Sequence, residues 1–258
     1  MTAITGKIVL ITGANRGIGR ALLEEALRRG AQQVYAGTRE SFAHPDERVT
    51  PLLLDVTDAA QTQQAAQAVP SLDILVNNAG VALSDDLNDR TVLERHLAVN
   101  LFGIYGVTQA FLPLLARSRG AIVNNVSMAA FAPLPVVPAY SISKAAAFSL
   151  TQSQRALLAD QGVRVHAVLA GPTDTDMSRE FDAPKASPES VARAIFDGVE
   201  NQEEDIFPDP MSQTMAAGWQ GSPAKTLERE YAAIATRLEF ENNPGAATTS
   251  GKDRPPSL

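Results

Sequence analysis

Near its amino terminus the chain reads Lys7-Ile8-Val9-Leu10-Ile11-Thr12-Gly13-Ala14-Asn15-Arg16-Gly17-Ile18-Gly19. The apolar first half is typical of a strand that is buried on both faces of a parallel sheet. The glycine-rich second half leads into a helical pattern in which Ile18, Leu22 and Ala26 recur every four residues. Glycines allow a tight turn and a close approach of the backbone to a phosphate, and a helix N-terminus attracts anions. The stretch therefore predicts a strand, a phosphate-binding turn and a helix in succession.

Further apolar runs alternate with helical patterns along the chain. The strand-like runs are residues 34–37, 49–54, 74–77, 121–127 and 164–169, and residues 205–208 are interpreted as a last edge strand, where proline is tolerated. Helical patterns cover residues 91–116 and 140–160, with Gly30 as a cap after the first helix and Ser187 as an N-cap near the end. The alternation predicts an α/β fold with a doubly wound parallel sheet of about seven strands and helices on both faces.

The composition fits one large domain. The chain has 258 residues, of which 45% are hydrophobic and 20% are charged, so it can bury a full core. We expect residues 1–241 to form this domain. Residues 242–258 are rich in Gly, Pro, Ala, Thr and Ser and have little to bury, so we expect a disordered tail there.

Composition also disfavours several classes of function. The chain has no cysteine, and its histidines, His44, His96 and His166, lack metal-ligand spacing, so we expect neither disulfides nor a metal site. A net charge of -7 argues against a nucleic-acid or anionic-membrane surface. No uninterrupted apolar stretch reaches the roughly 18 residues of a membrane span, and we find no signal-peptide pattern. We therefore expect a cytoplasmic protein that binds neither nucleic acid nor membrane.

Residues after the second predicted strand bear on the kind of nucleotide. The glycine spacing in the first turn is Gly-x-x-x-Gly-x-Gly, and the second strand ends in Gly37-Thr38-Arg39-Glu40, where an NAD site would carry an acid for the ribose. Arg39 and Arg16 can instead clamp a 2'-phosphate by charge-assisted hydrogen bonds, which favours NADPH over NADH. If the strand ends one residue later, Glu40 would take the ribose hydroxyls and the preference would reverse.

Two further strand ends carry polar residues. Asp55 closes the third predicted strand and is a candidate acceptor for the adenine amino group, although a turn or N-cap aspartate explains it nearly as well. The tetrapeptide Asn77-Asn78-Ala79-Gly80 closes the fourth strand, where short side chains fit a backbone bent beneath a cofactor. Taken alone, that tetrapeptide is a turn signal.

Tyr140 and Lys144 are four residues apart, so a helix places them on one face. A cation one turn away favours the phenolate form and lowers the pKa of a tyrosine, which is ordinarily about 10. The pair is therefore a candidate proton donor. Without other signals, the spacing also fits a half-buried ring beside a solvated lysine.

Taken together and in this order, the residue 12–19 turn, Asp55, residues 77–80, Asn100, Ser127, Tyr140 and Lys144 resemble the short-chain dehydrogenase/reductase family. The resemblance spans roughly residues 5–178, and Ser127 lies thirteen residues before Tyr140, as the family pattern requires. It implies a Rossmann-like fold, a nicotinamide cofactor and a catalytic tetrad of Asn100, Ser127, Tyr140 and Lys144. The arginines are similar to those of NADP-preferring, carbonyl reductase-like members.

The resemblance also implies a set of residues in contact with NADP(H). These are Gly13, Asn15, Arg16, Gly17, Ile18, Gly19, Thr38, Arg39, Asp55, Val56, Asn78, Ala79, Gly80, Tyr140, Lys144, Gly171, Pro172, Thr173 and Thr175. One departure from the family is Ala170, which stands where a proline is usual before Gly171 and weakens the expectation of a stiff loop there. A second is the end of the chain, which lacks a glycine-rich strand ending and argues against a fatty-acyl substrate.

The implied reaction is the reduction of a carbonyl. Tyr140 would give its proton to the forming alkoxide, Lys144 would lower the Tyr140 pKa and bind the nicotinamide ribose, Ser127 would orient the substrate oxygen, and Asn100 would hold a water that links Lys144 to solvent. Residues at strand ends and in an expected mobile lid at about 172–188 would line the pocket. They are Val81, Ala82, Leu83, Met128, Ala129, Phe131, Pro133, Pro172, Met177 and Phe181. We therefore expect an uncharged, hydrophobic substrate, unless Arg179 and Lys185 turn inward.

Two alternatives to an NADPH-dependent carbonyl reductase remain open. One is a non-catalytic NADP-binding sensor or scaffold, which an intact Ser127, Tyr140 and Lys144 disfavour. The other is an NAD-linked alcohol or steroid dehydrogenase. Apolar residues at 101–107 and 145–150 exceed what one sheet face requires, and the family resemblance implies a helix–helix interface there, so we expect a homodimer or homotetramer.

Overall fold

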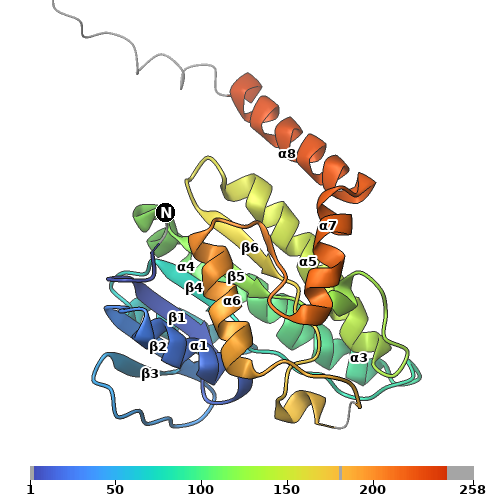
Figure 1. Cartoon of the computed structure of the whole chain (residues 1–258). Helices are drawn as coiled ribbons and strands as arrows, with labels where there is room; N and C mark the ends of the chain where they lie inside the picture. Colours follow the sequence, from blue (N-terminus) through green and yellow to red (C-terminus); the bar gives the residue numbers. More distant parts are fainter. Residues whose placement is uncertain (1–2, 180–181, 243–258) are drawn as a thin grey trace, which may run out of the picture.

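The computed structural model describes residues 3–179 and 182–242, and its centre is a parallel seven-stranded sheet (Figure 1). The strands are β1 (Ile8–Thr12), β2 (Gln33–Thr38), β3 (Val49–Leu53), β4 (Ile74–Asn77), β5 (Ala121–Asn125), β6 (Arg164–Val168) and β7 (Asp205–Ile206), in the order β3-β2-β1-β4-β5-β6-β7. The predicted Rossmann-like, doubly wound sheet is confirmed, including the edge position of β7.

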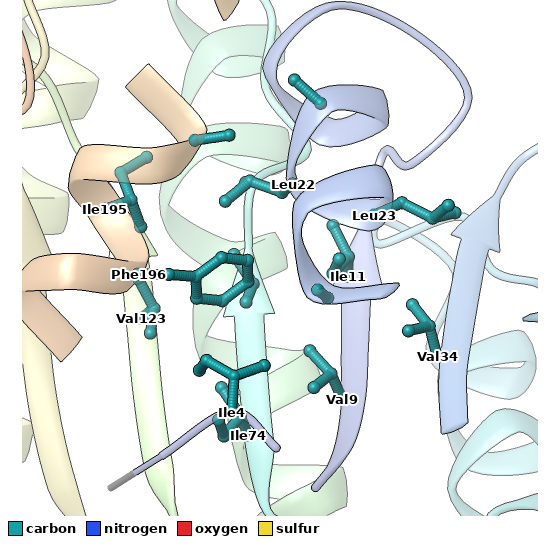
Figure 2. Close-up of a cluster of buried hydrophobic side chains, with 14 of the residues drawn as sticks. Ile4, Val9, Ile11, Leu22, Leu23, Val34, Ile74, Val123, Ile195 and Phe196 are labelled. Atoms are coloured by element: carbon teal, nitrogen blue, oxygen red, sulfur yellow. The ribbon is translucent and has the colours of Figure 1, made fainter. Parts of the chain in front are cut away.

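Helices cover both faces of the sheet because every strand buries side chains on both sides. On one face lie α1 (Gly17–Arg28) and α6 (Pro188–Glu200), whose Leu22, Leu23, Ile195 and Phe196 pack on strand residues such as Val9 (Figure 2). On the other face lie α2 (Ala59–Ala68), α4 (Ile104–Ser118) and α5 (Pro138–Leu158). The caps follow the sequence: Gly30 has a φ of 80° just after α1, and the Ser187 side chain accepts a hydrogen bond from Ser190 N in α6.

The order of the strands determines where a ligand can bind. The chain moves outward from β1 to β2 and β3, then returns to β4 on the other side of β1 and continues to β7. In open α/β sheets, the crevice at such a switch point lies beyond the carboxyl ends of the strands. The glycine-rich turn follows β1, and the Asn77-Asn78-Ala79-Gly80 segment begins at the last residue of β4, so both lie at this crevice.

The long helical pattern predicted for residues 91–116 is one continuous run with a change of pitch. It consists of α3 (Arg90–Leu97), a π-helical segment η1 (Ala98–Gly103) and α4. The π segment contains Asn100, and such segments are frequent at functional sites. The run Arg90–Ser118 is long and apolar enough to cross a membrane, and 33% of its most apolar window is buried, while Val107, Phe111 and Leu115 are buried against the sheet.

The sequence patterns did not predict the last two helices, α7 (Pro210–Gln220) and α8 (Pro223–Asn242), which lead away from the sheet (Figure 1). Trp219 of α7 packs on Phe131 and Phe148, and a buried ion cluster holds the start of α8. Lys225 is fully buried and pairs with Asp205 at 2.6 Å, Glu204 at 2.9 Å and Glu228 at 3.0 Å. The domain limits and the tail remain predictions, and residues 243–258 lie outside the described part of the chain.

Candidate active site

The turn between β1 and α1 is held in a conformation that requires glycine. Gly13 and Gly17 have φ angles of 67° and 51°, in the left-handed region that side chains disfavour. Gly19 has no room for a side chain, because a Cβ atom there would lie 2.1 Å from the Gly13 carbonyl oxygen. The backbone can therefore approach a ligand closely, and α1 begins at Gly17, as a phosphate-binding turn requires. Asn15 and Arg16 are exposed on this turn, and Ile18 packs on the core.

A threonine hydroxyl fixes the turn to the end of β4. The Thr12 side chain is buried and accepts hydrogen bonds from the backbone N–H groups of Asn78 at 2.9 Å and Ala79 at 3.0 Å. In return, Asn78 Nδ2 donates to the Thr12 carbonyl oxygen at 3.0 Å. The glycine-rich turn and the segment after β4 are therefore held together through Thr12, a site residue that no sequence pattern indicated.

The end of β5 joins this cluster through Asn125. Its Nδ2 donates to Asn78 Oδ1 at 3.0 Å, and its carbonyl oxygen accepts a hydrogen bond of 2.8 Å from Lys144 Nζ on α5. The ends of β1, β4 and β5 are thus linked to α5 by a chain of direct hydrogen bonds. Asn125 was not predicted, because asparagine at a strand end is an ordinary turn signal.

Lys144 is buried, with 5% of its surface exposed. Burial disfavours the charged form and lowers the pKa of the Lys144 ammonium from 10.5 to about 8. Its Nζ lies 5.6 Å from the centre of the Tyr140 ring, so the helix places the two groups on one face as the spacing predicted.

The pKa of Tyr140 differs from the expectation. Burial, the largest cause, raises the pKa of the Tyr140 phenol above its usual value, and interaction with the Ser127 side chain lowers it. The predicted lowering by Lys144 is therefore not what determines this pKa here, because the ammonium is directed to the Asn125 carbonyl. Tyr140 holds its proton, which is the form that a proton donor needs.

Ser127 begins the short 3-10 helix Met128–Ala130 just beyond β5. Its hydroxyl oxygen accepts a hydrogen bond from Ala129 N at 3.1 Å, and the hydroxyl donates to the Ala170 carbonyl oxygen at 3.4 Å. The long second contact leaves the hydroxyl proton weakly held, so it is available to a substrate oxygen beside Tyr140.

Asn100 is fully buried in the π segment, and its side chain is fully engaged. It binds the backbone of Val81 on both sides, accepting from the N–H and donating to the carbonyl oxygen, each at 2.9 Å, and it donates to Ser143 Oγ at 2.9 Å. Ser143 Oγ in turn donates to the Tyr140 carbonyl oxygen at 2.7 Å. The side chain therefore fixes the segment after β4 to the helix of Tyr140, and the expected water relay stays a prediction.

The residues predicted to choose the dinucleotide lie at the end of β2. The strand ends at Thr38, so Arg39 is the first residue beyond it and is exposed. Thr38 is buried and its hydroxyl donates to the Glu40 carbonyl oxygen at 2.7 Å, which turns the chain there. Within residues 3–179 and 182–242, Arg39 makes no ion pair, whereas Arg16 lies 3.6 Å from Asp176.

Asp55 forms a turn, and its predicted contact with the adenine amino group stays a prediction. Its Oδ1 accepts hydrogen bonds from Thr57 N at 2.9 Å and Thr57 Oγ1 at 2.7 Å. Next to it, Val56 is half-buried and fills the space above Gly103, where a Cβ would lie 2.7 Å from Val56 Cγ2. The packing of Val56 thereby ties the end of β3 to the π segment.

The loop after β6 is fixed by a residue far along the chain. Asp209, the N-cap of α7, accepts a hydrogen bond of 2.7 Å from Gly171 N, and a Cβ on Gly171 would lie 2.7 Å from Asp209 Oδ1. Thr173 is buried and pairs with Ala186 in a parallel bridge. Thr175 packs against Gly17: a Cβ added to Gly17 would lie 3.1 Å from Thr175 Cγ2. The loop has Ala170 where the family usually has a proline, and Pro172 comes two residues later. The hydrogen bond from Gly171 N to Asp209 stiffens the loop in place of that proline.

The expected pocket walls divide into packed and open residues. Phe131 stacks on Trp219 at 4.6 Å between ring centres, so it belongs to an aromatic cluster beneath the site. Met177 is exposed, and Leu83 is half-buried. Arg179 pairs with Asp176 at the surface, and Lys185 Nζ donates to the Arg179 carbonyl oxygen at 3.3 Å. Neither cation points into the site, and Phe181 lies outside the described residues.

Comparisons with known proteins agree with this geometry. The family model for short chain dehydrogenases matches residues 7–186. An uncharacterized oxidoreductase of Staphylococcus aureus strain N315 is 32% identical over 214 residues, which cover 76% of this chain and 92% of that protein. A crystal structure of a short chain dehydrogenase from Burkholderia cenocepacia J2315 in complex with NADP is similar at a TM-score of 0.82 and 35% identity, covering 89% of this chain and 98% of that one. ElxO with NADP bound is similar at a TM-score of 0.73 and 25% identity, covering 81% and 100%.

Proposed function

This chain belongs to the short-chain dehydrogenase family and is an oxidoreductase, and we propose that it reduces a ketone or aldehyde carbonyl reversibly to an alcohol with NADPH. The observation that carries the proposal is the convergence of Ser127, Tyr140 and Lys144 beyond the carboxyl end of β5. A phenol that keeps its proton, a weakly held hydroxyl and a buried ammonium together suit the formation of an alcohol from a carbonyl.

The glycine-rich turn has the shape that a dinucleotide needs. A Cβ on Gly13 would lie 3.1 Å from Ala79 Cα, and one on Gly80 would lie 3.2 Å from Asn100 Oδ1, so both glycines allow the turn and the segment after β4 to pack closely at the crevice. The pyrophosphate would meet the turn and the N-terminus of α1, the ribose would meet Lys144, and the carboxamide would meet residues 171–175. Arg39 and Arg16 would hold the 2'-phosphate. When bound, NADPH supplies the hydride.

The proton comes from the protein. Tyr140 would donate its phenolic proton to the carbonyl oxygen as negative charge develops there, and the Ser127 hydroxyl would donate a hydrogen bond to the same oxygen. The neighbouring Lys144 ammonium would then stabilise the phenolate that Tyr140 leaves. Asn125 and Asn100 hold Lys144 and the helix of Tyr140 in place.

The walls of the site favour an uncharged substrate. Leu83, Ala129 and Met177 are apolar, and the cations of the neighbouring segment are bound elsewhere. A carboxylate or phosphate on the substrate would have no described cation on these walls to pair with. We therefore propose a hydrophobic ketone, aldehyde or secondary alcohol.

The experiment that tests the function follows the absorbance of NADPH with acetophenone, cyclohexanone, benzaldehyde and ethyl acetoacetate, with pyruvate as a charged comparison. Wild type should oxidise NADPH with the uncharged compounds. Tyr140→Phe should lose turnover by about a thousandfold while its Kd for NADPH stays within about twofold. The matched control is Tyr231→Phe, because Tyr231 is exposed on α8. Retention of most turnover by Tyr140→Phe would refute the assignment of the proton donor.

The same measurements separate the two alternatives. Binding of NADPH without turnover of any carbonyl or secondary alcohol would favour a non-catalytic sensor or scaffold. Higher kcat/KM with NADH than with NADPH would favour an NAD-linked alcohol or steroid dehydrogenase. In the proposed enzyme, Arg39→Asp should weaken NADPH binding and leave NADH binding unchanged or stronger, because only the 2'-phosphate meets the arginine and an acid at this position suits the ribose hydroxyls of NADH.

We also propose that the protein forms a homodimer or homotetramer. Phe102 and Tyr105 are 61% and 50% exposed beside the sheet-covering face of α4, and Ile142 and Leu157 are exposed on α5. Exposed apolar side chains of this kind on two neighbouring helical segments fit contact between copies of the chain. Light scattering should give a dimeric or tetrameric mass, and Phe102→Asp should shift it toward the monomer.

A further inference from the structure

The segment that follows Gly80, which we name the wall loop (Val81–Asp89), is fixed by hydrogen bonds to residues outside it. Val81 is bound by Asn100, Leu83 N donates to His96 Nε2 at 3.0 Å, and the Asp85 carboxylate accepts from Ala139 N at 3.2 Å. His96 and Ala139 belong to α3 and α5. The loop has no helix or strand of its own, so these contacts determine its position.

His96 holds Leu83 only in one protonation state. The imidazole is fully buried, and its Nδ1 lies 2.8 Å from the Val92 carbonyl oxygen, which can only accept a hydrogen bond. Nδ1 therefore carries the hydrogen, and Nε2 offers its lone pair to the Leu83 N–H group. The same ring meets the Tyr140 ring edge to face, with centres 6.3 Å apart. His96 thus touches both the wall of the site and the proposed proton donor.

Asp85 acts on the helix that carries Tyr140. Ala139 lies in the first turn of α5, where backbone N–H groups lack partners within the helix, and the N-cap residue Val137 offers no side-chain hydrogen bond. The Asp85 carboxylate takes the place of that cap, with oxygens 3.2 and 3.3 Å from Ala139 N, and its charge suits a helix N-terminus. The residue it binds immediately precedes Tyr140.

We infer that His96 and Asp85 are positioning residues that clamp the wall loop against Tyr140 and so set the distance between the proton donor and the bound carbonyl. The inference rests on the proposed carbonyl reduction. Neither residue touches the reacting atoms. Loss of either contact frees the loop and lets Leu83 leave its place beside His96, whose ring meets that of Tyr140. The substrate would then be held less tightly, while NADPH binding, which we propose to rest on the glycine-rich turn, Lys144 and the arginines, would not be affected.

The test uses paired variants of the full chain. Asp85→Ala and His96→Leu remove the acceptors, whereas Asp85→Asn and His96→Gln keep an oxygen that can accept from Ala139 N and Leu83 N. Asp86→Ala is the matched control, because Asp86 is exposed in the same loop and accepts from Asn88 N at 3.1 Å without contacting α5. The wall loop and the first turn of α5 are followed by amide hydrogen exchange, and kinetics use the panel compound with the highest kcat/KM.

Asp85→Ala and His96→Leu should speed exchange in residues 81–89, and the first should also speed it at residues 139–141. Both should raise KM for the carbonyl compound about fivefold, which one hydrogen bond can account for, with Kd for NADPH within about twofold of wild type. Asp85→Asn and His96→Gln should return the exchange rates and the KM most of the way to the wild-type values. Asp86→Ala should match wild type.

Unchanged exchange in both Asp85→Ala and His96→Leu would overturn the clamp. So would an equal loss of kcat in all variants with KM unchanged, because that result is what general destabilisation produces. If wild type reduced no carbonyl at all, the proposed function would fail, and the exchange measurement would still decide whether the clamp exists.

Discussion

Lys144 Nζ donates a hydrogen bond of 2.8 Å to the Asn125 carbonyl oxygen, and through it the helix of the proposed proton donor is joined to the end of β5. The contact provides a dipole but no counter-charge, and among the residues that the structure describes no carboxylate pairs with this buried ammonium. A cation held in this way is costly to the fold and useful beside a phenol that must become a phenolate.

The cost predicts a dependence of stability on pH. The pKa of Lys144 falls from 10.5 to about 8 on folding, so the folded state releases a proton more readily than the unfolded state. Stability should therefore rise as the pH increases from about 8 toward 10.5, by an amount on the order of 3 kcal/mol, and should be lost again as the pH falls through about 8.

Lys144→Met removes this charge, so at neutral pH the variant should unfold at higher urea concentration than wild type, and the difference should shrink toward pH of about 10. It should also lose turnover. Lys185→Met, at a half-exposed position, is the control. If the difference in unfolding free energy between wild type and Lys144→Met did not change with pH, the lowered pKa of Lys144 would be contradicted.

The strands and the glycine-rich turn could be predicted because their signals are local. Apolar runs such as Ile8–Thr12 match parallel strands buried on both faces, and the glycines at 13, 17 and 19 occur where the backbone allows little else. The family pattern identified Ser127, Tyr140 and Lys144, and the structure has Ser127 just beyond β5 and the other two residues on α5. The domain limits stay predictions.

What escaped prediction depends on contacts between distant residues. Asp209 fixes Gly171 from 38 residues away, and Asp85 caps α5 from 54 residues away. The residues around each aspartate predict only a turn or a helix cap and do not indicate its distant partner. The pKa of Tyr140 also escaped, because the spacing of the lysine says nothing of how deeply the ring is buried or where the ammonium points.

The glycine-rich turn predicts a sharp contrast between two glycines. A methyl group at Gly19 would lie 2.1 Å from the Gly13 carbonyl oxygen and 2.6 Å from Asn78 Nδ2, so Gly19→Ala must displace the turn from the end of β4. We expect it to destabilise the fold by about 2 kcal/mol and to weaken NADPH binding by at least about tenfold.

Gly218→Ala is the control, because it lies exposed on α7 with no atom within 4 Å of the added carbon. It should raise stability by up to about 1 kcal/mol through helix propensity. Urea unfolding and NADPH fluorescence titration measure both variants. Normal NADPH binding by a folded Gly19→Ala would show that the turn does not approach the cofactor.

The buried cluster around Lys225 predicts how the last helices are held. Arg155 also pairs with Asp205 at 2.8 Å, and Trp219 Nε1 donates to the same carboxylate at 2.7 Å. Lys225→Met would leave Asp205 and Glu228 with Arg155 as their remaining basic partner, and the Glu204 carboxylate with no ion pair, among the described residues. Removing one partner of a buried ion pair costs about 3–5 kcal/mol.

We therefore expect Lys225→Met to detach α8 and to change the fluorescence of Trp219 at a lower urea concentration than wild type. Arg229→Met on the same helix is the control, because Arg229 is exposed and donates only to Gln220 Oε1 among the described residues. Coincident unfolding of Lys225→Met and wild type would mean that packing, not the ion cluster, attaches these helices.

The ion pair between Arg16 and Asp176 predicts a gain in cofactor binding. Arg16 Nη1 lies 3.6 Å from Asp176 Oδ2, and both side chains are more than half exposed. A 2'-phosphate that binds Arg16 must compete with this carboxylate and is repelled by its charge. Asp176→Asn should therefore lower the Kd for NADPH by about two- to fivefold at low salt, since an exposed pair contributes at most about 1 kcal/mol.

The gain should be absent for NADH, which has no 2'-phosphate, and should diminish at high ionic strength, because exposed charges are screened. Fluorescence titrations with both dinucleotides, at low and high salt, measure it. Asp182→Asn, at an exposed position of the same segment, should leave both affinities unchanged. An equal gain for NADH would mean that Asp176 acts on the shape of the residue 173–178 segment, whereas a gain confined to NADPH would place the 2'-phosphate at Arg16.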